Sequence, residues 1–165
     1  MTRSHSDLPL ALCAAFVVAL GYGTVLPLLP RFIQRLEAVA TPDAVAFQTA
    51  LLTGVYTLAL FFSAPFWGRL SDRTGHRKVL LIGLTGFALT IVGFGQVNHL
   101  GTAYAMRAGA GSFGGAVLAL SMAVAGSDIL QHRRARHIDW VSAATTLGFL
   151  AGPALGGWLP MPRPP

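Results

Sequence analysis

The stretch GRLSDRTGHRKVL occupies residues 68–80 and separates two long apolar runs. It combines several basic side chains with one acid, Asp72, and with two glycines, Gly68 and Gly75. The runs on either side are too long and too poor in charge for the surface of a water-soluble protein. The stretch therefore predicts a polar connection at a boundary between membrane and water.

The composition of the whole chain supports a membrane protein. Of the 165 residues, 53% are hydrophobic and 11% are charged, whereas a soluble domain usually has about a quarter charged residues. Crossing the hydrocarbon core takes about 20 apolar residues of helix, and five segments reach that length: 8–29, 45–67, 79–97, 102–126 and 138–159. We expect an all-α, polytopic membrane helix bundle with five transmembrane helices, forming a single transmembrane domain over residues 1–165.

The basic residues are distributed unevenly between the connections. They cluster at 69–78 and 133–136, Arg3 precedes the first span, and the connection at 98–101 has neither Lys nor Arg. The positive-inside rule then places the N-terminus in the cytoplasm. The net charge of +6 could also suit nucleic acid, but no aromatic interleaving or recognition motif accompanies it, so we expect no nucleic-acid partner.

Enzymatic and metal chemistry find no support in the sequence. Cys13 is the single cysteine, which excludes an internal disulfide and a cysteine-based metal site. There is no His-Glu metal motif and no pair of carboxylates within a span. We expect no enzyme, no cofactor and no metal.

The order of residues in the opening stretch resembles a signature of the major facilitator superfamily of secondary transporters, found there between the second and third spans. The matching positions are Gly68, Leu70, Asp72, Arg73, Gly75, Arg77 and Leu80, with His76 where the family usually has a basic residue. The resemblance implies a conformational latch, made by Gly68, Asp72, Arg73, Gly75 and Arg77, that closes against the second half of a transporter. Independently of the family, Gly68 would permit close helix approach and Gly75 a turn with positive φ. Positive-inside bias alone would explain only the basic residues.

Arg107 is the one cation well inside an apolar span. Such a charge costs about 2.5–3.5 kcal/mol on insertion scales and normally faces a protein interior. Its spacing to Gly111 and Gly115 resembles the family's fourth-span motif, which implies a role in proton coupling or in binding substrate charge. Ala110 and Phe113 depart from that motif. The alternative is that Arg107 extends to the outer interface.

The fifth span contains the sequence GFLAGPALGG at 148–157. Glycines at spacing four make a smooth helix face for close packing, and a proline bends the helix. The pattern is similar to the antiporter motif of drug–proton exchangers in the same superfamily. The residues that carry it are Gly148, Gly152, Pro153, Gly156 and Gly157.

One side of the second span offers candidates for lining a substrate cavity. They follow helical spacing and are Thr49, Thr53, Tyr56 and Thr57. The alternative is that these side chains make hydrogen bonds between helices. Because few charges accompany them, we expect an amphipathic substrate rather than a strongly ionic one.

Together the motifs resemble the N-terminal part of a twelve-helix drug–proton antiporter. The resemblance implies a multi-pass protein of the bacterial inner membrane. It also implies that this protein exports small amphipathic compounds in exchange for protons. The partners expected are the lipid bilayer, a small-molecule substrate, protons, and a missing C-terminal half or another chain. The only acid within the five spans is Asp139, at the cytoplasmic end of the fifth, so a proton carrier inside the membrane is not visible.

Other interpretations of the sequence stay open. The chain ends one helix short of a half-transporter in a proline-rich tail, so it could be a fragment, a truncated product or a subunit. A non-transporting remnant or membrane interaction subunit is one alternative function. A metabolite uptake carrier of the same superfamily is another, because it would share the motif at 68–80 but need not share that at 148–157.

Overall fold

The computed structural model of the chain describes residues 4–36, 41–127 and 131–158. Within these ranges every regular element is a helix, and there is no strand, so the predicted all-α fold is confirmed. The elements are α1 (Ser4–Val25), the 3-10 turn η1 (Leu26–Leu28), α2 (Leu29–Leu36), α3 (Pro42–Thr74), α4 (His76–Gly95), α5 (Leu100–Gly126) and α6 (Gln131–Trp158).

The helices follow the expected spans but differ from them at several ends. The first span continues past its expected end, since α2 follows α1 through a short 3-10 turn at Pro27 and runs to Leu36. At the other end of the chain, Leu159 and the proline-rich tail lie outside the described residues.

The polar stretch at 68–80 is mostly helical rather than a loop. Helix α3 continues through it to Thr74, and α4 begins at His76, so Gly75 alone forms the connection. Gly75 has φ +93°, a value that only glycine adopts easily, and its N–H donates to the carbonyl of Ser71 at 2.8 Å. The expected positive φ at Gly75 is confirmed.

Within the described residues, four segments are long and apolar enough to cross a bilayer. They are Leu8–Leu36, Pro42–Thr74, His76–Gly95 and Leu100–Gly126. Helix α6 has the length of a spanning helix, but basic residues fill its first turns and Gly, Ser, Thr and Pro dilute its apolar part. In α3 the start is fixed by Thr41, whose side chain accepts a hydrogen bond from the N–H of Ala44, and by Pro42 at the first position.

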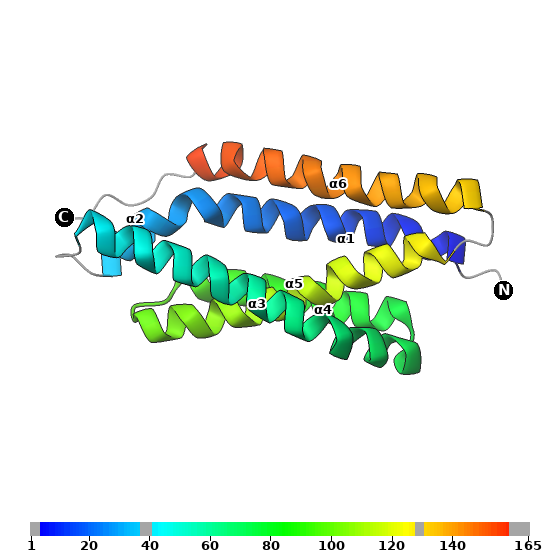
Figure 1. The fold of residues 1–165 in the computed structure, drawn as a ribbon, viewed down its shortest axis with the longest axis horizontal. Coiled ribbons are helices and arrows are strands. Elements are labelled where there is room, and N and C mark those ends of the chain that lie inside the picture. The colour runs from blue at the N-terminus through cyan, green and yellow to red at the C-terminus, as the bar shows by residue number, and fades with distance from the viewer. Residues whose placement is uncertain (1–3, 37–40, 128–130, 159–165) are drawn as a thin grey trace.

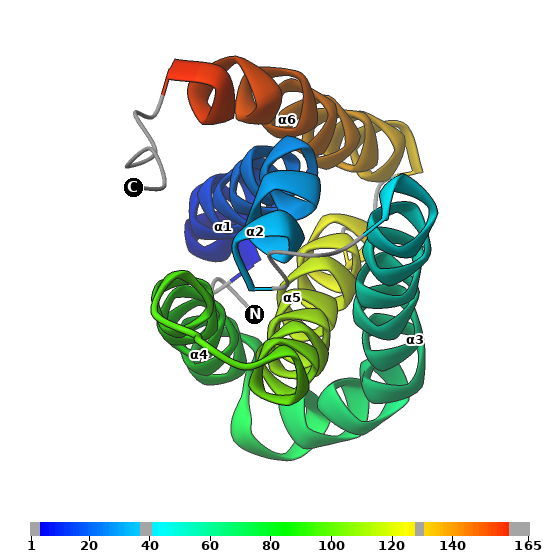
Figure 2. The same ribbon diagram turned by 90° about the vertical axis from the view of Figure 1, so that its left-hand side faces the viewer.

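The five long helices run side by side and nearly antiparallel (Figure 1). The start of α1, the α3–α4 turn and the start of α6 lie at the same end, so the two basic clusters share one end of the bundle. Viewed from the end, α5 lies between α3 and α4, and α6 covers α1 on the opposite side (Figure 2). Helix α5 is accordingly the most enclosed, with 56% of its most apolar segment buried against 17% for α3.

Small residues allow these helices to approach closely. On α5, a Cβ placed at Gly111 would overlap the carbonyl oxygen of Tyr56, and one at Gly115 would lie 2.8 Å from that of Leu60, both on α3. On α6, the three glycines at spacing four face α1: added Cβ atoms at Gly148, Gly152 and Gly156 would come within 2.5–2.8 Å of its backbone. The predicted smooth face of α6 is therefore its contact with α1.

The glycines of α6 allow a matched test of this packing. We expect Gly152→Ala to lower the free energy of unfolding by about 1–3 kcal/mol, because the new methyl group meets the backbone of Gly23 and one helix must shift. A Cβ at Gly157 would meet no atom within 4 Å, so Gly157→Ala should cause no loss. Unfolding of the purified chain in mixed detergent micelles measures both. Equal effects of the two substitutions would contradict close α1–α6 contact at Gly152.

Candidate functional site

Arg107 lies in the interior of the helix bundle, on α5. Only 1% of its surface is exposed, and it is the largest of the fully buried side chains. The alternative, in which Arg107 extends to the outer interface, is not the arrangement found. Its Nε, Nη1 and Nη2 atoms are buried without a hydrogen-bond partner among the described residues.

Aromatic rings surround the guanidinium of Arg107. Its central carbon lies 4.8 Å from the ring centroid of Tyr56 on α3, 5.5 Å from that of Tyr22 on α1 and 5.9 Å from that of Phe94 on α4. Each distance is within the range of a cation–π interaction, which is worth about 2 kcal/mol or more when the cation is desolvated. We call Arg107 with these three rings the arginine cage.

The cage joins five of the helices through ring contacts. The rings of Tyr22 and Tyr56 have centroids 4.4 Å apart, and Tyr22 also meets Phe149 of α6 edge-on at 5.3 Å. Phe94 stacks on Phe32 of α2 at 4.5 Å. The position of Arg107 is therefore determined by residues from every long helix, and a movement of any one helix would change its surroundings.

Gly111 and Gly114 make room for the cage. Gly111 lies one helical turn after Arg107 and allows α3 to approach at Tyr56 itself. A Cβ at Gly114 would lie 2.9 Å from the hydroxyl oxygen of Tyr56. Gly111 of the predicted fourth-span motif and Gly114, which was not predicted for this site, thus let the Tyr56 ring lie over the arginine.

Polar contacts between α3 and α5 lie on both sides of the cage. The hydroxyl of Tyr104 donates to the side-chain oxygen of Gln48. On the other side, Ser63 donates to the carbonyl of Ser112 at 3.2 Å, and the indole N–H of Trp67 donates to the Ser112 hydroxyl at 3.3 Å. These bonds hold the two helices in the register that the cage requires.

The candidate cavity-lining residues of α3 divide into two groups. Tyr56 is buried and belongs to the cage. Thr49, Thr53 and Thr57 each donate a hydrogen bond to the carbonyl four residues earlier on the same helix, at 2.7–3.0 Å. Their hydroxyl hydrogens are thus used within α3 and not between helices as the alternative interpretation expected, and their part in a cavity stays a prediction.

The predicted latch residues lie together at the end of α3 and the start of α4. Asp72, Arg73 and Arg77 are exposed, and Asp72 has no ion-pair or hydrogen-bond partner among the described residues. A Cβ at Gly68 would meet no described atom within 4 Å. The close helix approach expected at Gly68 is therefore not found in the described part of the chain, and the latch stays a prediction.

None of the carboxylates whose side chains the structure describes approaches the arginine cage. Asp43, Asp72 and Asp139 are exposed, Glu37 and Asp128 lie outside the described residues, and the side chain of Asp7 is not among those described. In the antiporter motif, Pro153 is exposed and Gly157 lies in open space. The described residues also contain no group of three or more His, Cys, Asp or Glu side chains that could hold a metal ion.

Comparison with known proteins gives the family. The family model of the Major Facilitator Superfamily matches residues 11–161. The chain belongs to the major facilitator superfamily. Its members are transporters, and with its apolar helices this makes the chain a multi-pass membrane protein.

Among curated proteins, several relatives are multidrug transporters or drug-resistance proteins by name. The chain is 35% identical over 161 residues to the tetracycline resistance protein, class C, of Escherichia coli, covering 95% of this chain and 39% of that protein. It is 30% identical over 153 residues to the multidrug transporter mfsB of Aspergillus fumigatus, covering 93% and 25%. It is 26% identical over 144 residues to the quinolone resistance protein NorA of Staphylococcus aureus, covering 87% and 36%. The chain thus spans between a quarter and two fifths of their lengths.

The cation–π contacts of the cage can be isolated by a double-mutant cycle. We expect Tyr56→Leu to destabilise the chain by about 1–2 kcal/mol more in the presence of Arg107 than in an Arg107→Met background, because only the former loses a desolvated cation–π contact. Tyr56→Phe keeps the ring and serves as the matched control, with little coupling to Arg107. The measurement is the free energy of unfolding of all variants in mixed micelles.

A coupling of zero between positions 56 and 107 would contradict the cage. So would a Tyr56→Phe variant as strongly coupled to Arg107 as Tyr56→Leu, because the phenol hydroxyl and not the ring face would then be the partner.

Proposed function

We propose that this chain supplies the first five helices of a proton-coupled exporter of small amphipathic compounds. The observation that carries the proposal is the arginine cage: a cation buried within the bundle, without a hydrogen-bond partner among the described residues, at the junction of every long helix. Burying a charged side chain inside a membrane protein costs free energy, so such a residue is taken by default to have a function. The relatives named as multidrug and drug-resistance transporters support export over uptake.

The role proposed for Arg107 is electrostatic. Its guanidinium has donors free to bind an acceptor, either an anionic group of the substrate or a carboxylate that loses a proton during the cycle. Because Asp43, Asp72 and Asp139 are exposed, we propose that the proton-carrying carboxylate comes from further helices, in a C-terminal half of the same protein or in a second chain. Rocking of two halves about a central site would then expose Arg107 alternately to each side.

The glycine face of α6 and the exposed latch have different proposed roles. Gly148, Gly152 and Gly156 keep α6 and α1 together as one rigid unit within the half. Asp72, Arg73 and Arg77 stay available at the end of the bundle for the other half. We place the protein in the bacterial inner membrane, with the N-terminus in the cytoplasm.

Export by an assembled transporter tests this proposal. The chain is produced in bacteria that lack their own drug exporters, either alone or joined to the remaining helices of the class C tetracycline resistance protein. We expect ethidium accumulation to fall only with the joined form, because a five-helix unit has no second half to move against. Fluorescence of intact cells measures accumulation, and export by the chain alone would refute the requirement for a second half.

Arg107→Met in the joined form tests the role of the cage. We expect this variant to reach the membrane in normal amounts but to lose export, since a thioether side chain fills the space without carrying charge. Undiminished export would remove Arg107 from the mechanism. Collapsing the proton gradient with an ionophore should stop export by the unsubstituted joined form, and continued export would exclude proton coupling.

A further inference from the structure

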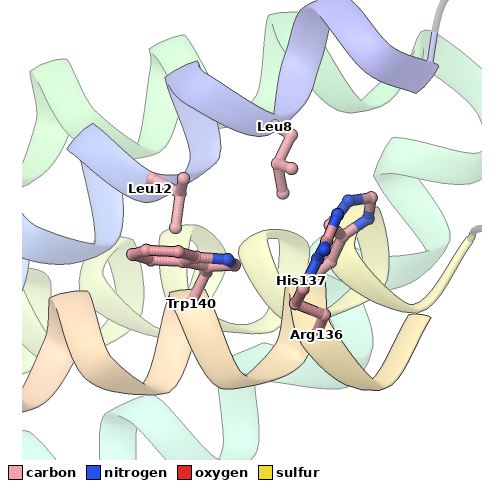
Figure 3. Close-up of a pocket in the computed structure, with 5 residues that line it drawn as sticks. All are labelled: Leu8, Leu12, Arg136, His137 and Trp140. Atoms are coloured by element: carbon pink, nitrogen blue, oxygen red, sulfur yellow. The ribbon is translucent and has the colours of Figure 1, made fainter. Parts of the chain in front are cut away.

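A second concave site lies away from the arginine cage, between the beginnings of α1 and α6. It has a volume of about 440 Å³ and is lined by Leu8 and Leu12 of α1 and by Arg136, His137 and Trp140 of α6. The two leucines point from α1 toward the α6 side chains, and the nitrogen-bearing groups of Arg136 and His137 gather at the end away from the Trp140 ring (Figure 3). The pocket therefore has an apolar part and a basic part.

The pocket lies at a level of the bundle where an apolar part and a basic part are both expected. It lies at the end where the start of α1, the start of α6 and the α3–α4 turn meet, which is the end that carries the basic clusters. By the positive-inside rule that end faces the cytoplasm. Trp140 is 59% exposed, and tryptophan is enriched at the level of the lipid head groups, where the ring faces hydrocarbon and the N–H faces water.

On α6 the charged residues near the pocket are mostly basic. Arg133 and Arg134 precede Arg136 by three and two residues and are also exposed, although neither lines the pocket. The nearest acid on this helix is Asp139, which is exposed and does not line the pocket. Basic pockets between transmembrane helices on the cytoplasmic side are suited to acidic lipid head groups, and the guanidinium of Arg136 can bind two phosphate oxygens at once.

We propose that this pocket binds one anionic glycerophospholipid of the cytoplasmic leaflet. The phosphate of the head group lies against Arg136, and the upper part of an acyl chain lies along Leu8, Leu12 and the Trp140 ring. A free phosphate ion would use the basic part alone and would leave the apolar part in water, so the lining favours the lipid. The bound lipid bridges α1 and α6, the two helices that the glycine face already joins.

Quenching of tryptophan fluorescence by brominated lipid tests the site. The chain is reconstituted into phosphatidylcholine vesicles in which a quarter of the lipid is brominated, either as phosphatidylglycerol or as phosphatidylcholine. We expect stronger quenching by phosphatidylglycerol, and no excess in Trp140→Phe, which identifies Trp140 as the reporter. Arg136→Gln should weaken the preference for phosphatidylglycerol about fivefold, the amount that one basic side chain contributes near a charged surface.

Lys78→Gln is the matched control, because it removes one positive charge from an exposed position at the same end of the bundle, at the start of α4 and outside the pocket. It should leave the preference unchanged. Equal quenching by the two lipids, or an equal loss in Lys78→Gln and Arg136→Gln, would overturn the proposal in favour of non-specific attraction. Loss of the preference on adding inorganic phosphate would overturn it in favour of a free-ion site. None of these measurements depends on transport.

Discussion

The arrangement of the helices centres on one unsatisfied charge. Arg107 is buried to 1% exposure in a bundle whose described residues offer its three nitrogens no acceptor, and the faces of three aromatic rings partly replace the missing water. Ring faces attract a cation but cannot accept all the hydrogen bonds that a guanidinium can donate. The cage therefore holds Arg107 in place while leaving it able to bind a stronger acceptor.

This constraint explains why close packing is concentrated where it is. A ring acts on a cation only within about 6 Å of its centroid, so α3 must approach α5 at Tyr56, and only a residue without a Cβ permits that at Gly111. The ring of Tyr22 on α1 must also lie within this distance of Arg107. Helix α1 is held in position by α6, which packs against it through Gly148, Gly152 and Gly156. Two glycine faces on different helices thus serve one site.

The sequence was sufficient for the fold because a bilayer leaves few alternatives to a spanning helix. Apolar length, positive-inside bias and the motif order gave the helices and the family, and Gly75 adopts the positive φ that its place in the motif required. The continuation of α3 to Thr74 was missed because arginines and an aspartate near a helix end are equally compatible with a loop. The glycine faces could be predicted from the four-residue spacing of glycines within one span, because a helix face without side chains favours close packing whichever helix lies against it.

The cage itself was less accessible to prediction. Arg107 and Tyr56 were each singled out, but for separate roles, and Tyr22 and Phe94 were not considered for this site. The rings come from three different helices, and nothing in the linear order says which faces meet. An aromatic residue within a span is equally expected to point outward, as Phe61 and Phe62 of α3 do in leaving most of their surface exposed. Only the packing of α3 and α1 on α5 distinguishes the two cases.

The distribution of exposed groups also bears on how such a half would work. The buried site carries a positive charge and no described acid, whereas Asp43, Asp72, Asp139, Arg73 and Arg77 are exposed. Helix α3 has few of its apolar residues buried. A cation inside and acids outside is an unbalanced arrangement for a unit that acts alone. It becomes balanced if a second half brings an acceptor to Arg107 and a partner to Asp72 in the same movement, so that binding at the cage and closure of the latch are energetically linked. On that view the low burial of α3 is a requirement of the mechanism, because a helix that must meet a moving partner cannot be covered by its own half.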